Sequence, residues 1–107
     1  MNKQLPAFLK VLKRPLDLDD YQKWAIATFS PQLEADAKLN FLSLGLFGEV
    51  GSLLSALKKK LRDGPAYVGY QRTVEEEFGD SMWYLANIAA HHDIVLSEIS
   101  PRSVDEG

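Results

Sequence analysis

The sequence predicts an all-α fold of one domain. Apolar residues recur at the helical spacings of three and four in three separate stretches of the chain. Two strong breaks, Ser30-Pro31 and Asp63-Gly64-Pro65, divide those stretches. No stretch alternates apolar and polar residues in the way that predicts a half-buried strand. A chain of 107 residues has the length of a single domain, so we expect residues 1–107 to form one all-α unit.

Composition narrows the classes of function. Hydrophobic residues make up 46% and charged residues 25% of the chain, as in an ordinary globular protein. The formal net charge of -3 provides no basic footprint, which argues against a nucleic-acid polymer as partner. Because there is no cysteine, a metal site must use oxygen or imidazole ligands, which favours Mg²⁺ or Mn²⁺. No run approaches the roughly 20 apolar residues of a membrane span, so we expect a cytoplasmic protein without a membrane partner.

An N-terminal arm precedes the first full helix. Residues 1–16 are expected to pack on the body as an arm or short helix that Pro15 closes. Asp17 is a suitable N-cap for a helix that runs to about Phe29. Trp24 on this helix is expected in the core or in the wall of a groove.

A long second helix is predicted from about Asp36 to Arg62. One face is lined by Leu42, Leu46, Val50, Leu53, Leu57 and Leu61. Another side gathers small residues, namely Gly45, Gly48, Gly51, Ser52 and Ser55. Each glycine costs about 1 kcal/mol relative to alanine inside a helix. Either a neighbouring backbone or a ligand approaches closely on that side, or the helix breaks at the glycines.

The third helix, predicted from about Gln71 to His92, carries two stripes. The apolar stripe, expected to face the core, comprises Val74, Phe78, Met82, Leu85, Ile88 and Ala89. A polar stripe beside it comprises Glu77, Asp80, Tyr84, Asn87 and His91. Trp83 lies nearly opposite the apolar stripe, which predicts a contact between subunits. After this helix, residues 97–107 have room only for a short C-terminal element or tail, because Pro101 interrupts them.

Three carboxylates form the candidate site. Glu77 and Asp80 lie one helical turn apart and project the same way, so they repel each other unless a cation or a proton sits beside them. The short loop between the second and third helices predicts an antiparallel hairpin, in which Glu49 can face this pair. Such a cluster can hold Mg²⁺, which prefers to bridge to phosphate oxygens. The alternative is that all three are solvated surface charges.

Two segments carry recognisable motifs, namely Leu-Gly-Leu-Phe-Gly-Glu-Val-Gly at 44–51 and Glu-Glu-Phe-Gly-Asp-Ser-Met-Trp-Tyr-Leu at 76–85. Together they resemble the MazG-like nucleoside triphosphate pyrophosphohydrolases. Tyr21-Gln22 and Thr28 also resemble the opening helix of small proteins of this family. The resemblance implies a helical hairpin whose four-helix packing is completed in a homodimer or homotetramer. It also implies Mg²⁺-dependent hydrolysis of a nucleoside triphosphate to the monophosphate and pyrophosphate.

The family's metal motif, E-x-x-E followed by E-x-x-D, matches three of its four acids in this chain. Its first acid falls on Glu49 and its last two on Glu77 and Asp80, which implies catalytic and metal-binding roles for these residues. Its second acid falls on Ser52. A hydroxyl there leaves four alternatives: weaker metal binding, a ligand that acts through water, recruitment of Glu76, or an inactive site.

Three further residues are candidates for substrate binding. Lys59 shares the angular side of Ser52 and suits phosphate oxygens, although Lys58-Lys59-Lys60 also suits a solvated helix end. Tyr84 suits stacking on the nucleotide or a hydrogen bond to it, and equally suits a half-buried core. Asn87 extends the same stripe. A second function stays open, namely a non-catalytic helical oligomerisation module with a degenerate metal site, which Ser52 and the short C-terminal tail favour.

Overall fold

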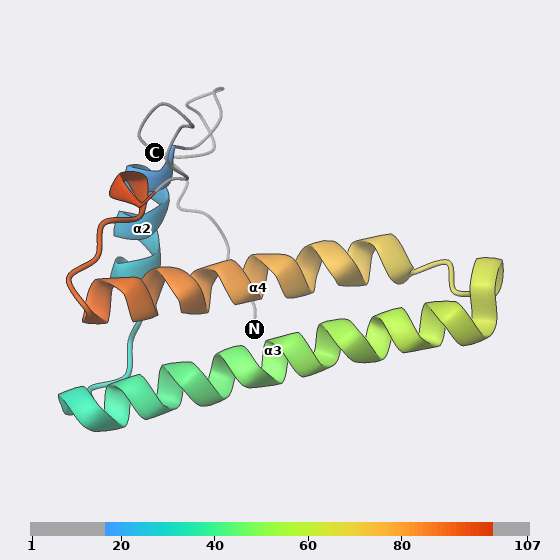
Figure 1. Ribbon diagram of the computed structural model, residues 1–107, viewed down its shortest axis with the longest axis horizontal. Coiled ribbons are helices and arrows are strands. Elements are labelled where there is room, and N and C mark those ends of the chain that lie inside the picture. The colour runs from blue at the N-terminus through green and yellow to red at the C-terminus, as the bar shows by residue number, and fades with distance from the viewer. Residues whose placement is uncertain (1–16, 100–107) are drawn as a thin grey trace, which may run out of the picture.

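The computed structural model describes residues 17–99 and confirms the all-α fold class for them (Figure 1). The elements in chain order are α2 (Leu18–Ala27), α3 (Ala35–Asp63), the 3₁₀ helix η1 (Gly64–Ala66), α4 (Tyr70–His91) and the 3₁₀ helix η2 (Leu96–Glu98). The long helices α3 and α4 form an antiparallel hairpin, and α2 packs on the C-terminal half of α4 with η2 beside it. The predicted arm at 1–16 and residues 100–107 of the predicted tail lie outside the described residues.

The helix boundaries follow local signals. The Asp17 carboxylate caps α2 by accepting a hydrogen bond from the Asp20 backbone N–H at 2.8 Å. Helix α3 passes through its mid-helix glycines without a break, so the alternative of a broken helix is not realised. It ends at Asp63, where Gly64 takes a φ of 55°, a left-handed conformation that favours glycine.

The core lies where α2 meets the hairpin. It consists of Trp24, Ala25, Leu42, Trp83, Tyr84 and Ala86. The Trp83 ring stacks on Phe29 with ring centroids 5.9 Å apart, and its Nε1–H donates to Thr28 Oγ1 at 2.7 Å. Trp83 is only 3% exposed, so the prediction of a subunit contact through this residue is wrong. Helix α2 covers that face of α4, and the periodicity of α4 alone does not reveal where α2 packs.

A buried amide fixes α2 against the end of α4. Gln22 Nε2 donates to the carbonyls of Ala86 at 3.3 Å and Ile94 at 2.9 Å, while its Oε1 accepts from the Leu96 N–H at 3.0 Å. These bonds satisfy a side chain that is only 6% exposed. They also join α2 to the end of α4 and to the segment that follows it, which lie 64 to 74 residues away in the sequence.

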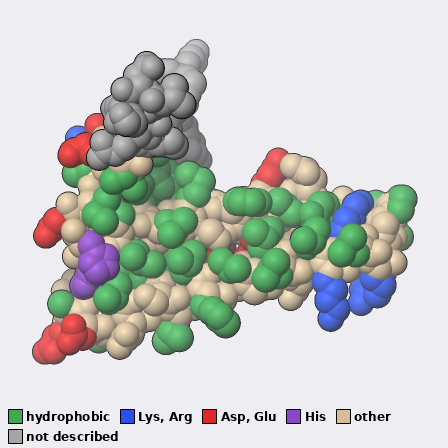
Figure 2. Space-filling model, in the orientation of Figure 1, with side chains coloured by type: hydrophobic (Ala, Val, Ile, Leu, Met, Phe, Trp, Pro, Cys, Tyr) green, Lys and Arg blue, Asp and Glu red, His purple; other side chains and the backbone are tan. Residues whose placement is uncertain are grey.

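The apolar stripes of the hairpin are largely exposed, contrary to expectation. Exposure reaches 55% at Phe78, 47% at Met82 and 51% at Leu85, whereas Asp80 and Asn87 of the polar stripe are buried. On α3, the predicted leucine face is buried only at Leu42. Figure 2 shows hydrophobic side chains spread over α3 and α4 on the face in view. We use the term apolar face for Val50, Leu54, Leu57, Phe78, Met82 and Leu85, which are all exposed.

Helix α3 belongs to a long apolar segment that is mostly exposed in the single chain. By length and composition, the segment Ala35–Ala66 is apolar enough to cross a membrane, a test that core helices of soluble proteins also pass. Very little of this segment is buried inside the single chain. Exposed apolar patches of this kind usually mark a surface that contacts another protein or a membrane.

Candidate metal centre and groove

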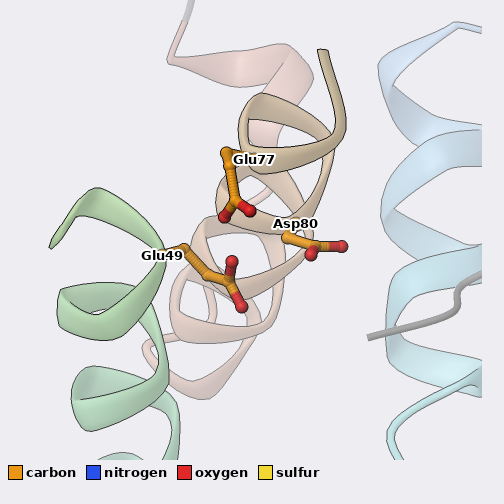
Figure 3. A group of neighbouring side chains, drawn as sticks. All are labelled: Glu49, Glu77 and Asp80. Atoms are coloured by element: carbon orange, nitrogen blue, oxygen red, sulfur yellow. The ribbon is translucent and has the colours of Figure 1, made fainter. Parts of the chain in front are cut away.

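Three carboxylates from two helices converge in the middle of the hairpin (Figure 3). Glu49 comes from α3, whereas Glu77 and Asp80 lie one turn apart on α4. One carboxylate oxygen of each residue lies within 4.8 Å of the other two. The antiparallel pairing of α3 and α4 brings Glu49 to the level of the other two acids. The predicted convergence is therefore confirmed.

The Glu77 carboxylate has one oxygen without a hydrogen-bond partner among the described residues and lies beside other acids. Its Oε2 atom is buried and has no hydrogen-bond partner in the described part of the chain. A hydrogen bond with Glu49 is the main cause that raises the pKa of Glu77 to about 7, followed by burial and by the charges of Glu49, Asp80 and Glu76. Below about pH 7, a proton on Glu77 thus relieves the repulsion within the cluster. A divalent cation can take the place of that proton, and three carboxylates fit Mg²⁺ or Mn²⁺.

Two tyrosines border the cluster. Burial, and then the charge of Asp80, raises the pKa of Tyr21 to about 12. Burial also raises the pKa of Tyr84, followed by the charges of Glu49 and Asp80. Both phenols keep their protons at neutral pH and remain hydrogen-bond donors. The sequence did not identify Tyr21 as a site residue, because only the packing of α2 on α4 brings it near Asp80.

An open groove of about 600 Å³ lies beside the cluster. Its lining combines Glu77 with small residues of α3 and with side chains near the hairpin turn, namely Gly48, Gly51, Ser52, Ser55, Ala56, Lys59, Tyr67 and Thr73. A Cβ atom at Gly48 or Gly51 would have no neighbour within 4 Å. The small-residue side of α3 therefore faces open space here. The volume falls in the range of roughly 300–1,000 Å³ that is typical of small-molecule pockets.

Lys59 and Ser52 line this same groove, as their angular positions predicted. Lys59 Nζ lies 4.3 Å from the centroid of the Tyr67 ring, a cation–π contact that helps to hold the ammonium group beside the groove. The Tyr67 and Thr73 hydroxyls are 3.3 Å apart. Neither Tyr67 nor Thr73 was predicted, because one lies in the connection between helices and the other belongs to no recognisable motif.

Tyr84 and Asn87 are engaged in packing. Tyr84 is 5% exposed, lies against Gly45 and makes a T-shaped ring contact with Trp83. Asn87 Nδ2 donates to the carbonyls of Ala25 and Trp83, each at 3.1 Å, and so ties α2 to α4. Neither residue belongs to the lining of the groove. Their predicted contact with a substrate stays a prediction.

Comparison with known proteins identifies a distant homologue. The gene 37 protein of Mycobacterium phage L5 is 33% identical to this chain over 70 residues, which cover 64% of the chain and 61% of that protein. The chain thus spans about three fifths of the length of the relative that it matches. No family model matches the chain, and no solved structure matches it. This homology assigns no family to the chain.

Proposed function

We propose that this protein is a Mg²⁺-dependent nucleoside triphosphate pyrophosphohydrolase of the MazG-like type. It would convert a ribo- or deoxyribonucleoside triphosphate to the monophosphate and pyrophosphate. The main support is the convergence of Glu49, Glu77 and Asp80 beside a groove that Lys59 also lines. The resemblance of segments 44–51 and 76–85 to that family supports the same reaction.

The charges of the site suit a triphosphate. The three carboxylates would hold the cation, which neutralises and orients phosphate oxygens when bound. Lys59 would meet phosphate charge farther along the groove. Water would attack the α-phosphorus, a cluster carboxylate would accept its proton, and the bond from that phosphorus to the bridging oxygen would break. The products are the nucleoside monophosphate and pyrophosphate.

Ser52 affects how the cation would be held. An acid at this position would add a fourth carboxylate beside the cluster, whereas the hydroxyl leaves the three that the cluster has. Mg²⁺ commonly binds through one or two carboxylates together with substrate phosphates. We therefore expect the metal to bind this chain weakly alone and more tightly together with the nucleotide.

We further infer that a second copy of the chain covers the apolar face. Val50, Leu54 and Leu57 on α3 follow the spacing i, i+4, i+7, and Phe78, Met82 and Leu85 on α4 follow the same spacing. A hairpin with such stripes is half of a four-helix bundle, and a two-fold related hairpin would complete it. A membrane is a less suitable cover, because α3 would carry Glu49 of the cluster into the bilayer.

The test is pyrophosphate release from each common nucleoside triphosphate in the presence of Mg²⁺ or Mn²⁺. We expect release from the wild-type protein and none from the double variant Glu77→Gln, Asp80→Asn. Glu75→Gln is the matched control, because Glu75 is an exposed acid on the same helix outside the cluster. If the wild-type protein releases no pyrophosphate from any nucleotide, the non-catalytic oligomerisation module becomes the better explanation.

A further inference from the structure

We propose that Gly45 and Tyr84 are positioning residues, which set the separation of α3 and α4 beside the carboxylate cluster. The contact between them would hold Glu49 at the right distance from Glu77 and Asp80. This inference rests on the proposed metal site. It requires no particular substrate and no particular catalytic step.

The Tyr84 ring lies directly against the backbone of α3 at Gly45. A Cβ atom at Gly45 would overlap Cε1 and Cζ of Tyr84 and would lie 2.7 Å from its Oη. A Cβ atom at Gly48, Gly51 or Gly79 would have no neighbour within 4 Å. Of these four helical glycines, Gly45 is the one whose missing side chain admits the neighbouring helix.

The Tyr84 ring has little freedom to move away. It is 5% exposed, and its centroid lies 5.1 Å from that of Trp83 with the ring planes at 87°. Trp83 is itself held by its stacking on Phe29 and its hydrogen bond to Thr28. Because interiors are close-packed, a methyl group at residue 45 would push the two helices apart rather than turn the ring outward.

The contact lies one helical turn from the cluster on both helices. Gly45 precedes Glu49 by one turn on α3, and Tyr84 follows Asp80 by one turn on α4. Since the helices are antiparallel, both steps lead in the same direction along the hairpin. The charges of Glu49 and Asp80 also contribute to the raised pKa of Tyr84, which agrees with this proximity. A change of helix separation at Gly45 therefore changes the distance between the carboxylates of the two helices.

The test is the binding of Mn²⁺ to the whole chain, measured from the electron paramagnetic resonance signal of free Mn²⁺. We expect Gly45→Ala to weaken Mn²⁺ affinity by about tenfold or more, the scale on which partners that orient metal ligands act. Gly79→Ala is the matched control, because it adds the same methyl group next to Asp80 in the chain without meeting a neighbour. Its affinity should stay within about twofold of the wild-type value. Circular dichroism at the same temperature must show that each variant is folded.

Variants of Tyr84 separate positioning from a general loss of stability. Tyr84→Phe keeps the ring and should bind Mn²⁺ like the wild type, whereas Tyr84→Ala removes the spacer and should bind more weakly. The double variant Gly45→Ala, Tyr84→Ala should bind more tightly than either single variant, because each change compensates for the other. If the two changes only destabilised the fold, their separate losses of Mn²⁺ affinity would add in the double variant.

The outcomes also separate this inference from the proposed function. Wild-type affinity in both Gly45→Ala and Tyr84→Ala would overturn the positioning role and leave the metal site intact. If Gly45→Ala does not fold, the comparison of Tyr84→Ala with Tyr84→Phe decides alone, and equal affinities overturn the proposal. If the wild-type protein binds no Mn²⁺ with or without nucleotide, the metal site and the proposed function fail together with it.

Discussion

The two ends of the α3–α4 hairpin differ in how far their side chains are buried. At one end α2 closes the hairpin, and Leu42, Trp83 and Tyr84 are buried in the core that it creates. Toward the turn, Ala56 is the buried hydrophobic residue of α3, and small side chains leave a groove. The carboxylate cluster lies between these two ends. The difference indicates that the covered end supplies most of the chain's own stability, while the end near the turn leaves small side chains around an open groove.

Truncation of a large side chain at each end should show the largest contrast. Trp83→Ala removes a ring that is 3% exposed and its hydrogen bond to Thr28, so we expect a loss of about 3–5 kcal/mol in the free energy of unfolding. Val68→Ala near the turn should change it by less than about 0.5 kcal/mol, because Val68 is 93% exposed. Urea denaturation measures both values. Similar losses would show that the two ends contribute equally to stability.

A charge on the apolar face should disrupt assembly. If a second copy covers this face, wild-type protein at micromolar concentration should have at least twice the chain mass in light scattering, and Leu54→Lys should be monomeric. Ala37→Lys adds the same charge at an exposed position of α3 outside the stripe and should leave the mass unchanged. A monomeric wild-type protein would contradict the assignment of this face to a second copy.

The pH dependence of stability should report the cluster itself. A carboxyl group whose pKa is raised on folding binds its proton more tightly in the folded state, so its stabilisation is present below the ordinary pKa of 4.5 and is lost as the pH rises through about 7. Without metal, the free energy of unfolding should fall across this window in the wild type and stay flatter in Glu77→Gln. Stabilisation by Mg²⁺ should grow over the same window, because the metal requires the ionised carboxylates. Equal pH profiles for the two proteins would argue against the coupling of Glu77 with Glu49.

The smallest effect concerns Ser52 at the edge of the groove. Ser52→Glu adds a carboxylate one turn from Glu49, on the groove that Glu77 lines. In EDTA the added repulsion should lower stability by up to roughly 1 kcal/mol. In millimolar Mg²⁺ the fourth carboxylate should instead raise it, since the charge of the ligands helps to set affinity. Melting curves that shift equally in both buffers would show that no metal binds beside residue 52.

Local signals account for the features that the sequence predicted well. The N-cap at Asp17 and the stop at Asp63-Gly64-Pro65 act through neighbouring backbone groups, so both helix ends could be located to within about a residue. The meeting of Glu49 with Glu77 and Asp80 was also predictable, because a short turn between two helices leaves little freedom in how they pair.

Only the tertiary structure decided which faces are covered. Helical periodicity determines which side chains share a face, but a stripe has the same spacing whether its cover is another helix, a second copy or solvent. Periodicity therefore predicts an outward Trp83, which α2 in fact buries, while Phe78 and Met82 of the expected core stripe are exposed. The same limit applies to Gly45, because its lack of a side chain gains a meaning only from the Tyr84 ring that packs on it. The sequence by itself thus determined the helices and the candidate cluster, and packing between distant segments determined everything that surrounds them.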